Sequence, residues 1–144
     1  MDLVPLDEAG QLFLSPDITT DDWQTLERVG ITAVFDLDGG LDIGVPTVPD
    51  GVVYLYFPFN DHHLPNLGRL HAVARFGDML VKAGHKLLSH CGLGYNRSAL
   101  VAGLILMYLG KSGTQAVEEL RRRRPGALYN QTYASYLLSC RLEV

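Results

Sequence analysis

The residues best suited to chemistry lie together in the stretch HCGLGYNRS, residues 90–98. It contains a cysteine, Cys91, then five residues that include Gly92 and Gly94, and then Arg97. Glycines let a short loop curl until consecutive backbone N–H groups point at one place, and such a nest binds anions. The planar guanidinium of Arg97 can add paired hydrogen bonds to phosphate oxygens. The segment therefore predicts a phosphate-binding loop with a nucleophile beneath it.

The flanking elements support this interpretation. Residues 86–89 have the pattern of a short buried strand, and an apolar helix is expected over residues 98–109. A loop between a strand and a helix lies where α/β proteins bind anions, because the unpaired N–H groups of the first helical turn face it. The positive end of the expected helix and the charge of Arg97 also favour the thiolate form of Cys91, which is the reactive form of a cysteine.

Strand-like and helix-like segments alternate along the whole chain. Strands are expected at residues 11–14, 31–37, 52–59 and 86–89, and helices at about 23–29, 67–83, 98–109, 114–124 and 131–141. This alternation predicts one α/β domain over residues 1–144. We expect a largely parallel central sheet of about four to five strands, with helices on both faces.

The motif at 90–98 (histidine, cysteine, five residues, arginine, serine) resembles the signature of the cysteine-dependent protein tyrosine phosphatases. The small, atypical dual-specificity members of that superfamily carry a general-acid aspartate about thirty residues before the cysteine, and Asp61 stands at that spacing in YFPFNDHHLP. They also carry an arginine-rich helix end and then an asparagine or glutamine before the last helix, which RRRRPGALYN, ending at Asn130, resembles. The similarity extends over nearly the whole chain.

The resemblance implies a phosphomonoester hydrolase that works through a phosphocysteine, with no metal or other cofactor. Cys91 is the implied nucleophile. Asp61 is the implied general acid that protonates the leaving oxygen and then the base that activates water. Ser98 is expected to stabilise the departing thiolate by hydrogen bonding.

The same resemblance assigns phosphate binding to the loop between the strand and the helix. Its backbone N–H groups and the Arg97 side chain would stabilise the charge on the phosphoryl oxygens; the loop residues are Gly92, Leu93, Gly94, Tyr95, Asn96 and Arg97. His90 is expected to order the loop from behind. Asn130 is expected to tie the loop backbone or to position water.

Other functions fit parts of the sequence. The stretch VFDLDGG resembles the start of the haloacid-dehalogenase-type phosphatases, in which Asp36 and Asp38 would serve a magnesium-assisted reaction, but a glycine replaces the usual threonine and no later GDxxxD follows. Rhodanese-type sulfurtransferases also place a cysteine in an anion-binding loop, and a phospho-binding module could keep the loop without turnover. The presence of Asp61 and Ser98 favours a phosphatase over these two alternatives, since neither a sulfurtransferase nor a binding module needs a general acid.

Composition limits the compartment and the partners. Sixteen acidic and 12 basic residues give a net charge of −4, whereas surfaces that bind nucleic acid or anionic lipid carry a positive excess. Two cysteines are too few for a secreted disulfide scaffold. The longest apolar run, residues 99–109, is shorter than the ~20 residues of a membrane span, and the first residues do not form a signal-peptide pattern.

We therefore expect a cytoplasmic monomer with no nucleic-acid, membrane or metal partner. Its expected substrates are phosphorylated proteins, with phosphotyrosine first and phosphoserine or phosphothreonine as further candidates, or a small phosphomonoester. Phosphoinositides are disfavoured because the loop carries no Lys or Arg besides Arg97.

Overall fold

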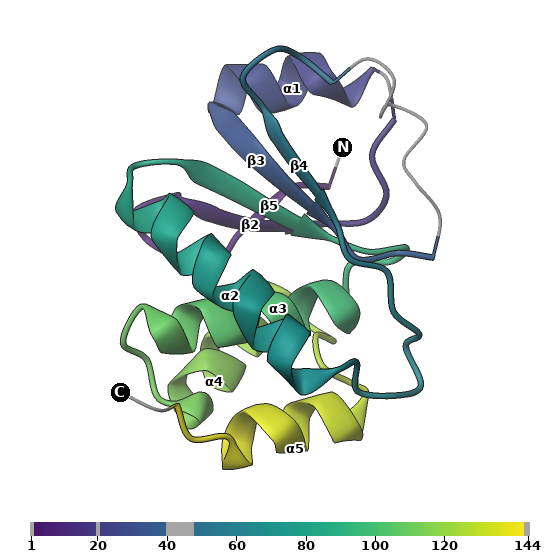
Figure 1. The fold of residues 1–144 in the computed structure, drawn as a ribbon, viewed down its shortest axis with the longest axis vertical. Helices are drawn as coiled ribbons and strands as arrows, with labels where there is room; N and C mark the ends of the chain where they lie inside the picture. Colours follow the sequence, from purple (N-terminus) through teal and green to yellow (C-terminus); the bar gives the residue numbers. More distant parts are fainter. Residues whose placement is uncertain (1, 20, 40–47, 143–144) are drawn as a thin grey trace.

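The computed structural model describes residues 2–19, 21–39 and 48–142. Within them, one sheet has the strand order β1-β2-β5-β3-β4 (Figure 1). β1 runs antiparallel to β2, and the other neighbours are parallel. The strands are β1 (Val4–Pro5), β2 (Leu12–Ser15), β3 (Ile31–Asp36), β4 (Val53–Tyr56) and β5 (Lys86–His90). The predicted strands are confirmed, and β1 is an addition that the sequence pattern does not reveal.

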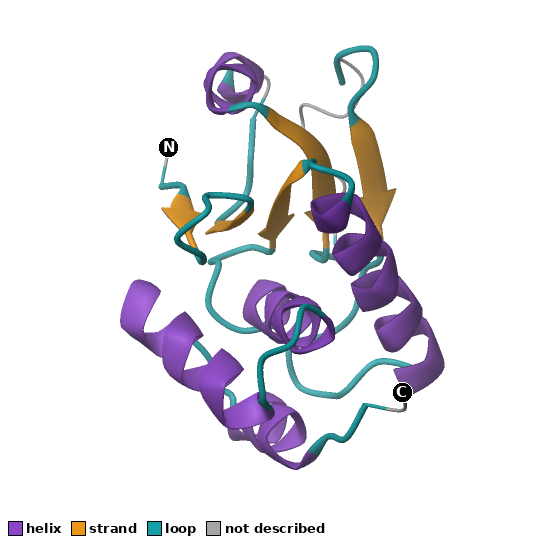
Figure 2. Cartoon of the chain, turned by 90° about the vertical axis from the view of Figure 1, so that its left-hand side faces the viewer, coloured by secondary structure: helices purple, strands orange, loops and turns teal. Residues whose placement is uncertain are grey.

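Helices cover both faces of the sheet, as predicted. They are α1 (Asp22–Val29), α2 (Leu67–Lys82), α3 (Arg97–Tyr108), α4 (Gly113–Arg123) and α5 (Gln131–Ser139). α1 lies on one face, while α2, α3, α4 and α5 lie on the other (Figure 2). The fold class is therefore the expected α/β arrangement.

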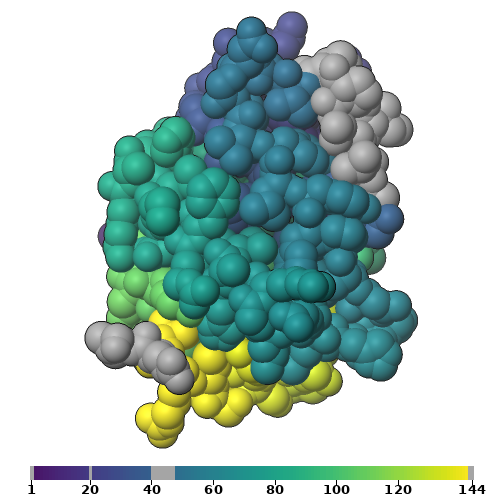
Figure 3. Space-filling view, viewed as in Figure 1, coloured from purple at the N-terminus to yellow at the C-terminus, as the bar shows by residue number. Residues whose placement is uncertain are grey.

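The core differs in size between the two faces. On the α1 side, Trp23 and Leu26 pack with side chains of β2, β3 and β5. On the other side, α3 is buried from Ser98 to Met107, as expected of a helix that is apolar all round. It contacts the sheet and α2, α4 and α5. In the space-filling view α2 (teal) and α5 (yellow) are visible on the face toward the viewer (Figure 3). α3 is thus the central helix on this side of the sheet.

Parallel pairing brings the carboxyl ends of three strands to one edge of the sheet. His90, the last residue of β5, pairs with Asp36 of β3 and with Ser15 of β2. The loops that follow these strands must therefore meet above the start of α3, which is where α/β proteins place ligand sites.

No helix in the described part of the chain is long and apolar enough to cross a membrane.

Candidate active site

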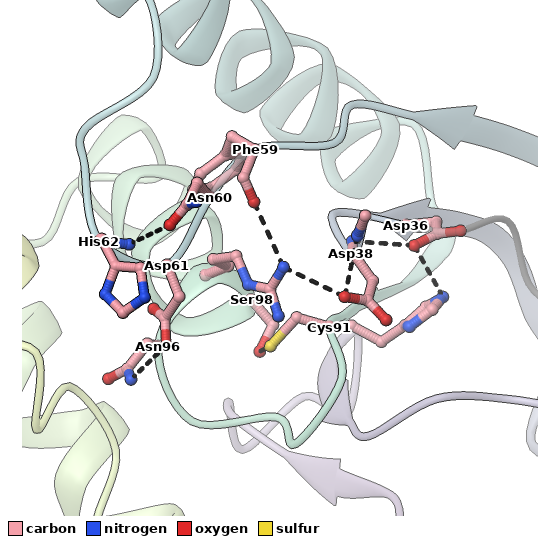
Figure 4. Close-up of polar contacts among 12 residues, drawn as sticks. Asp36, Asp38, Phe59, Asn60, Asp61, His62, Cys91, Asn96 and Ser98 are labelled. Atoms are coloured by element: carbon pink, nitrogen blue, oxygen red, sulfur yellow. Dashed lines mark hydrogen bonds and ion pairs between the residues drawn. The ribbon is translucent and has the colours of Figure 1, made fainter.

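The loop between β5 and α3 has the geometry expected of an anion cradle. Cys91 is 3% exposed, and its Sγ lies 3.3 Å from Oγ of Ser98, so the two can share a hydrogen bond (Figure 4). Gly94 adopts φ +77°, the left-handed conformation that lets the loop curl. The N–H groups of the first α3 turn point toward the loop, as in helix N-terminal anion sites.

Arg97, the first residue of α3, is held by two neighbouring loops. Its Nη1 donates to the carbonyl oxygen of Phe59 at 3.2 Å and lies 3.1 Å from Oδ1 of Asp38 (Figure 4). Burial of Asp38 opposes its ionisation, but the Gly39 N–H, the Arg97 charge and a hydrogen bond with Asp17 together hold the pKa of that carboxyl below its usual value. Asp38 and Arg97 therefore form an ion pair at the mouth of the loop.

Asp61, the predicted general acid, lies beside the loop and is bound by two asparagines. Oδ2 of Asp61 accepts from Nδ2 of Asn96 at 3.1 Å (Figure 4). Nδ2 of Asn130 donates to the Asp61 carbonyl at 2.6 Å, and the Asn130 N–H donates to Oδ1 of Asn96 at 3.0 Å. These bonds join three parts of the chain: the loop around Asp61 (the acid loop, between β4 and α2), the loop between β5 and α3 (the anion loop), and the start of α5. Oδ1 of Asp61 is buried and has no hydrogen-bond partner in the described residues.

α5 holds the acid loop from behind through Tyr133. The buried hydroxyl of Tyr133 lies 2.8 Å from the carbonyl oxygen of Asn60 and 2.9 Å from that of His63. Burial and the nearby Asp61 charge raise the pKa of Tyr133 well above its usual range. The hydroxyl therefore stays a donor, and it ties α5 to the residues on either side of Asp61.

A small pocket of about 40 Å³ lies between the anion loop and Asp61. It is lined by Asp61, Cys91, Leu93, Tyr95, Asn96, Arg97 and Tyr129. Leu93 and Tyr129 are 66% and 59% exposed and form an apolar rim. An open groove of about 420 Å³, lined by Asp38, Phe59 and His62, shares Asp61 and Arg97 with this pocket. The thiol, the cation and the carboxyl predicted from the sequence thus face one space.

His90 lies behind the loop and next to Asp36. Both side chains are fully buried, and Nε2 of His90 is 3.9 Å from Oδ1 of Asp36. Oδ2 of Asp36 accepts from the Tyr54 hydroxyl at 2.6 Å, and Oδ1 accepts from the Asp38 N–H at 3.0 Å. The carboxylates of the VFDLDGG stretch are therefore engaged with His90 on one side and Arg97 on the other.

Sequence reasoning missed three parts of this site. The sequence pattern places Asp38 only in the alternative, magnesium-assisted motif, and it identifies neither Tyr133 nor Tyr129 as a site residue. Asp38 reaches the site because β3 and β5 are paired in parallel and end side by side, and the sequence pattern does not give that strand order. Nothing in the sequence pattern marks Tyr129 or the hydroxyl of Tyr133.

Comparison with known proteins finds that the chain is similar to dual-specificity phosphatases. No protein-family model matches it. It is 26% identical over 133 residues to Dual specificity protein phosphatase 26 of Homo sapiens and of Pongo abelii. That alignment covers 89% of this chain and 63% of the relatives, so the chain spans less than two thirds of their length.

Two solved structures share the fold over most of their length. Human DUSP28 superposes with a TM-score of 0.80 at 26% identity, covering 94% of this chain and 89% of that one. Tk-PTP in its active form also gives 0.80, at 29% identity and 97% coverage of both chains. These findings confirm the resemblance to the small, atypical dual-specificity type of cysteine-dependent phosphatase and the predicted fold class.

Proposed function

We propose that the chain is a metal-independent phosphomonoester hydrolase of the cysteine phosphatase type. The observation that carries the proposal is one pocket lined by the thiol of Cys91, the guanidinium of Arg97 and the carboxyl of Asp61. Each group matches one need of phosphoryl transfer, namely a nucleophile, a charge clamp and an acid. The 63% coverage of the curated relatives makes their activity a premise to be tested on this chain.

In the first step, the Cys91 thiolate attacks phosphorus from the floor of the loop. An S–P bond forms while the bond from phosphorus to the leaving oxygen breaks, and Asp61 gives that oxygen its proton. Oδ1 of Asp61 is suited to carry the proton, because Oδ2 is occupied by the Asn96 amide. Arg97 and the loop N–H groups stabilise the charge on the three remaining phosphoryl oxygens.

In the second step, water attacks the phosphocysteine and its proton passes to Asp61. The S–P bond breaks, and the loop holds the inorganic phosphate until it dissociates. Ser98 Oγ, 3.3 Å from the sulfur, donates a hydrogen bond to the departing thiolate. The acid of the first step is thus the base of the second, and the site returns to its starting state.

The rim of the pocket supports an aryl phosphate substrate, with phosphotyrosine as the first candidate. Leu93 and Tyr129 are exposed beside the phosphate cradle, and the ring of Tyr95 lies 6.1 Å from that of Tyr129. Apolar and aromatic side chains at this place can contact the ring of a phosphotyrosine, whereas a phosphoserine has no ring for them to contact. Phosphoserine and phosphothreonine are the second candidates.

The test is release of p-nitrophenol from p-nitrophenyl phosphate by wild type, Cys91→Ser and a matched control, in EDTA and in magnesium. The control is Cys140→Ser, which changes the other cysteine of the chain, at the end of α5 and outside the pocket. We expect the wild type and Cys140→Ser to be active in EDTA and Cys91→Ser to be inactive. Activity that requires magnesium and ignores Cys91 would overturn the proposal and return Asp36 and Asp38 to consideration. Phosphate binding without turnover in the wild type would overturn it in favour of a phospho-binding module.

A further inference from the structure

Asp38 comes directly after β3 and reaches the anion loop from the side. A Cβ built on Gly92 would lie 3.6 Å from Oδ2 of Asp38 and 3.6 Å from Nη2 of Arg97. The carboxylate and the guanidinium therefore sit together over the first turn of the loop. The Asp38 side chain is only 27% exposed and that of Arg97 only 16%, so water screens this pair less than an ordinary surface ion pair.

The two edges of the Arg97 guanidinium differ in what they contact. Nη1 has two hydrogens, and it has two acceptors, Oδ1 of Asp38 at 3.1 Å and the carbonyl of Phe59 at 3.2 Å. Nε is buried and has no hydrogen-bond partner in the described residues. Nη2 lies over Gly92. The Nε–Nη2 edge is the fork that binds two oxygens of one phosphate.

We infer that Asp38 is a positioning residue that holds the outer edge of Arg97 so that the Nε–Nη2 fork faces the phosphate. This inference rests on the proposed function of the loop. An arginine side chain has several rotatable bonds, and ordering it during substrate binding costs free energy. Anchoring Nη1 in advance removes part of that cost, which is how preorganised charge contributes to binding and catalysis.

The alternative is that Asp38 competes with phosphate for Arg97. The geometry argues against it, because Asp38 and the Phe59 carbonyl use the hydrogens of Nη1 and leave the other edge open. The two ideas also predict opposite results. Removing a competitor strengthens phosphate binding, whereas removing an anchor weakens it.

The experiment measures inorganic phosphate binding by calorimetry in the Cys91→Ser background, and kcat/KM for p-nitrophenyl phosphate with Cys91 present. The variants are Asp38→Ala, Asp38→Asn and the control Asp78→Ala, which removes a carboxylate paired with Lys82 away from the site. We expect Asp38→Ala to weaken phosphate binding and lower kcat/KM about tenfold, the size of one lost hydrogen bond to a charged group. Asp38→Asn keeps an oxygen acceptor and should lose clearly less, and the control should lose nothing.

Several results would overturn the inference. Phosphate binding that is unchanged or tighter in Asp38→Ala excludes an anchor. If Asp38→Asn weakens phosphate binding as much as Asp38→Ala does, the effect is due to charge alone and not to an anchoring hydrogen bond. If Asp38→Ala does not fold by circular dichroism, Asp38→Ser replaces it under the same criteria. A wild type that binds phosphate in an Asp38-dependent way but releases no p-nitrophenol would refute the proposed function and leave this inference standing.

Discussion

A methyl group at Gly94 should disturb the anion loop more than one at any nearby glycine. Gly94 has φ +77°, and a Cβ there would lie 2.9 Å from both the carbonyl carbon and oxygen of Ser15 and 3.0 Å from the nitrogen of Pro16. All three atoms are backbone atoms at the end of β2, which the sheet holds in place. Relief therefore requires the loop itself to move.

Two other glycines separate the contributions to this cost. Gly10 has φ +68° with no atom within 4 Å of an added Cβ, so Gly10→Ala should cost only the left-handed conformation, roughly 1–2 kcal/mol. Gly92 shows no such φ, and its nearest neighbours lie at 3.6 Å, so Gly92→Ala should change stability by less than about 1 kcal/mol. Gly94→Ala adds overpacking of roughly 1–3 kcal/mol to the conformational cost, about 2–5 kcal/mol in all.

Urea unfolding of the three alanine variants measures these free energies. A folded domain has about 5–15 kcal/mol of stability, so Gly94→Ala should still fold at 25 °C and its turnover can be assayed. We expect turnover to fall as well, because a loop that moves away from Ser15 no longer aims its N–H groups at one point. A Gly94→Ala variant no less stable than Gly10→Ala would refute the close approach of the loop to β2.

Three further predictions concern the acid and the protein's pH dependence. Asp61→Asn should lower turnover of alkyl phosphates by roughly 10²–10⁴ and that of p-nitrophenyl phosphate much less, since a good leaving group needs no proton; equal losses would remove Asp61 from the acid role. Asn96→Ala removes the hydrogen bond to the Asp61 carboxyl, so turnover of alkyl phosphates should fall about tenfold and turnover of p-nitrophenyl phosphate less. An equal loss on both substrates would indicate a structural role only. Burial and the Arg75 charge hold the pKa of His71, in α2, below its usual value of 6.5, so the unfolded chain binds this proton at a higher pH than the folded chain does. The contribution of His71 to stability should therefore be fully present above pH 6.5 and decline as the pH falls below it. A urea midpoint that drops as much from pH 7.5 to 5.5 in His71→Gln as in wild type would contradict this.

The anion loop could be predicted from the sequence because its parts are neighbours in the chain. Glycine conformations, a strand end and a helix start are local features, and Cys91, Arg97 and Ser98 follow one another within eight residues. The short distance from Cys91 Sγ to Ser98 Oγ is then a consequence of one turn leading into one helix. Hydrophobic periodicity likewise predicted every described helix to within a few residues.

Asp61 was found by a different route, since only its spacing in a known family pointed to it. Why the carboxyl comes to the loop is decided by residues much farther along the chain. Asn130 and Tyr133, at the start of α5, hold the backbone around Asp61 through side-chain bonds that no local pattern implies. The path of this loop therefore depends on the completed packing of α5.

Asp36 and Asp38 show most clearly what only the tertiary structure decided. In the sequence they form a short acidic motif with a plausible metal chemistry of its own. In the fold, β3 pairs with β5 in parallel register, so Asp36 ends beside His90 and Asp38 reaches Arg97. The amino-acid sequence by itself determined which residues could bind a phosphate, because that ability resides in one contiguous loop. Strand order determined which charges surround it, because only long-range packing brings the ends of separate strands together.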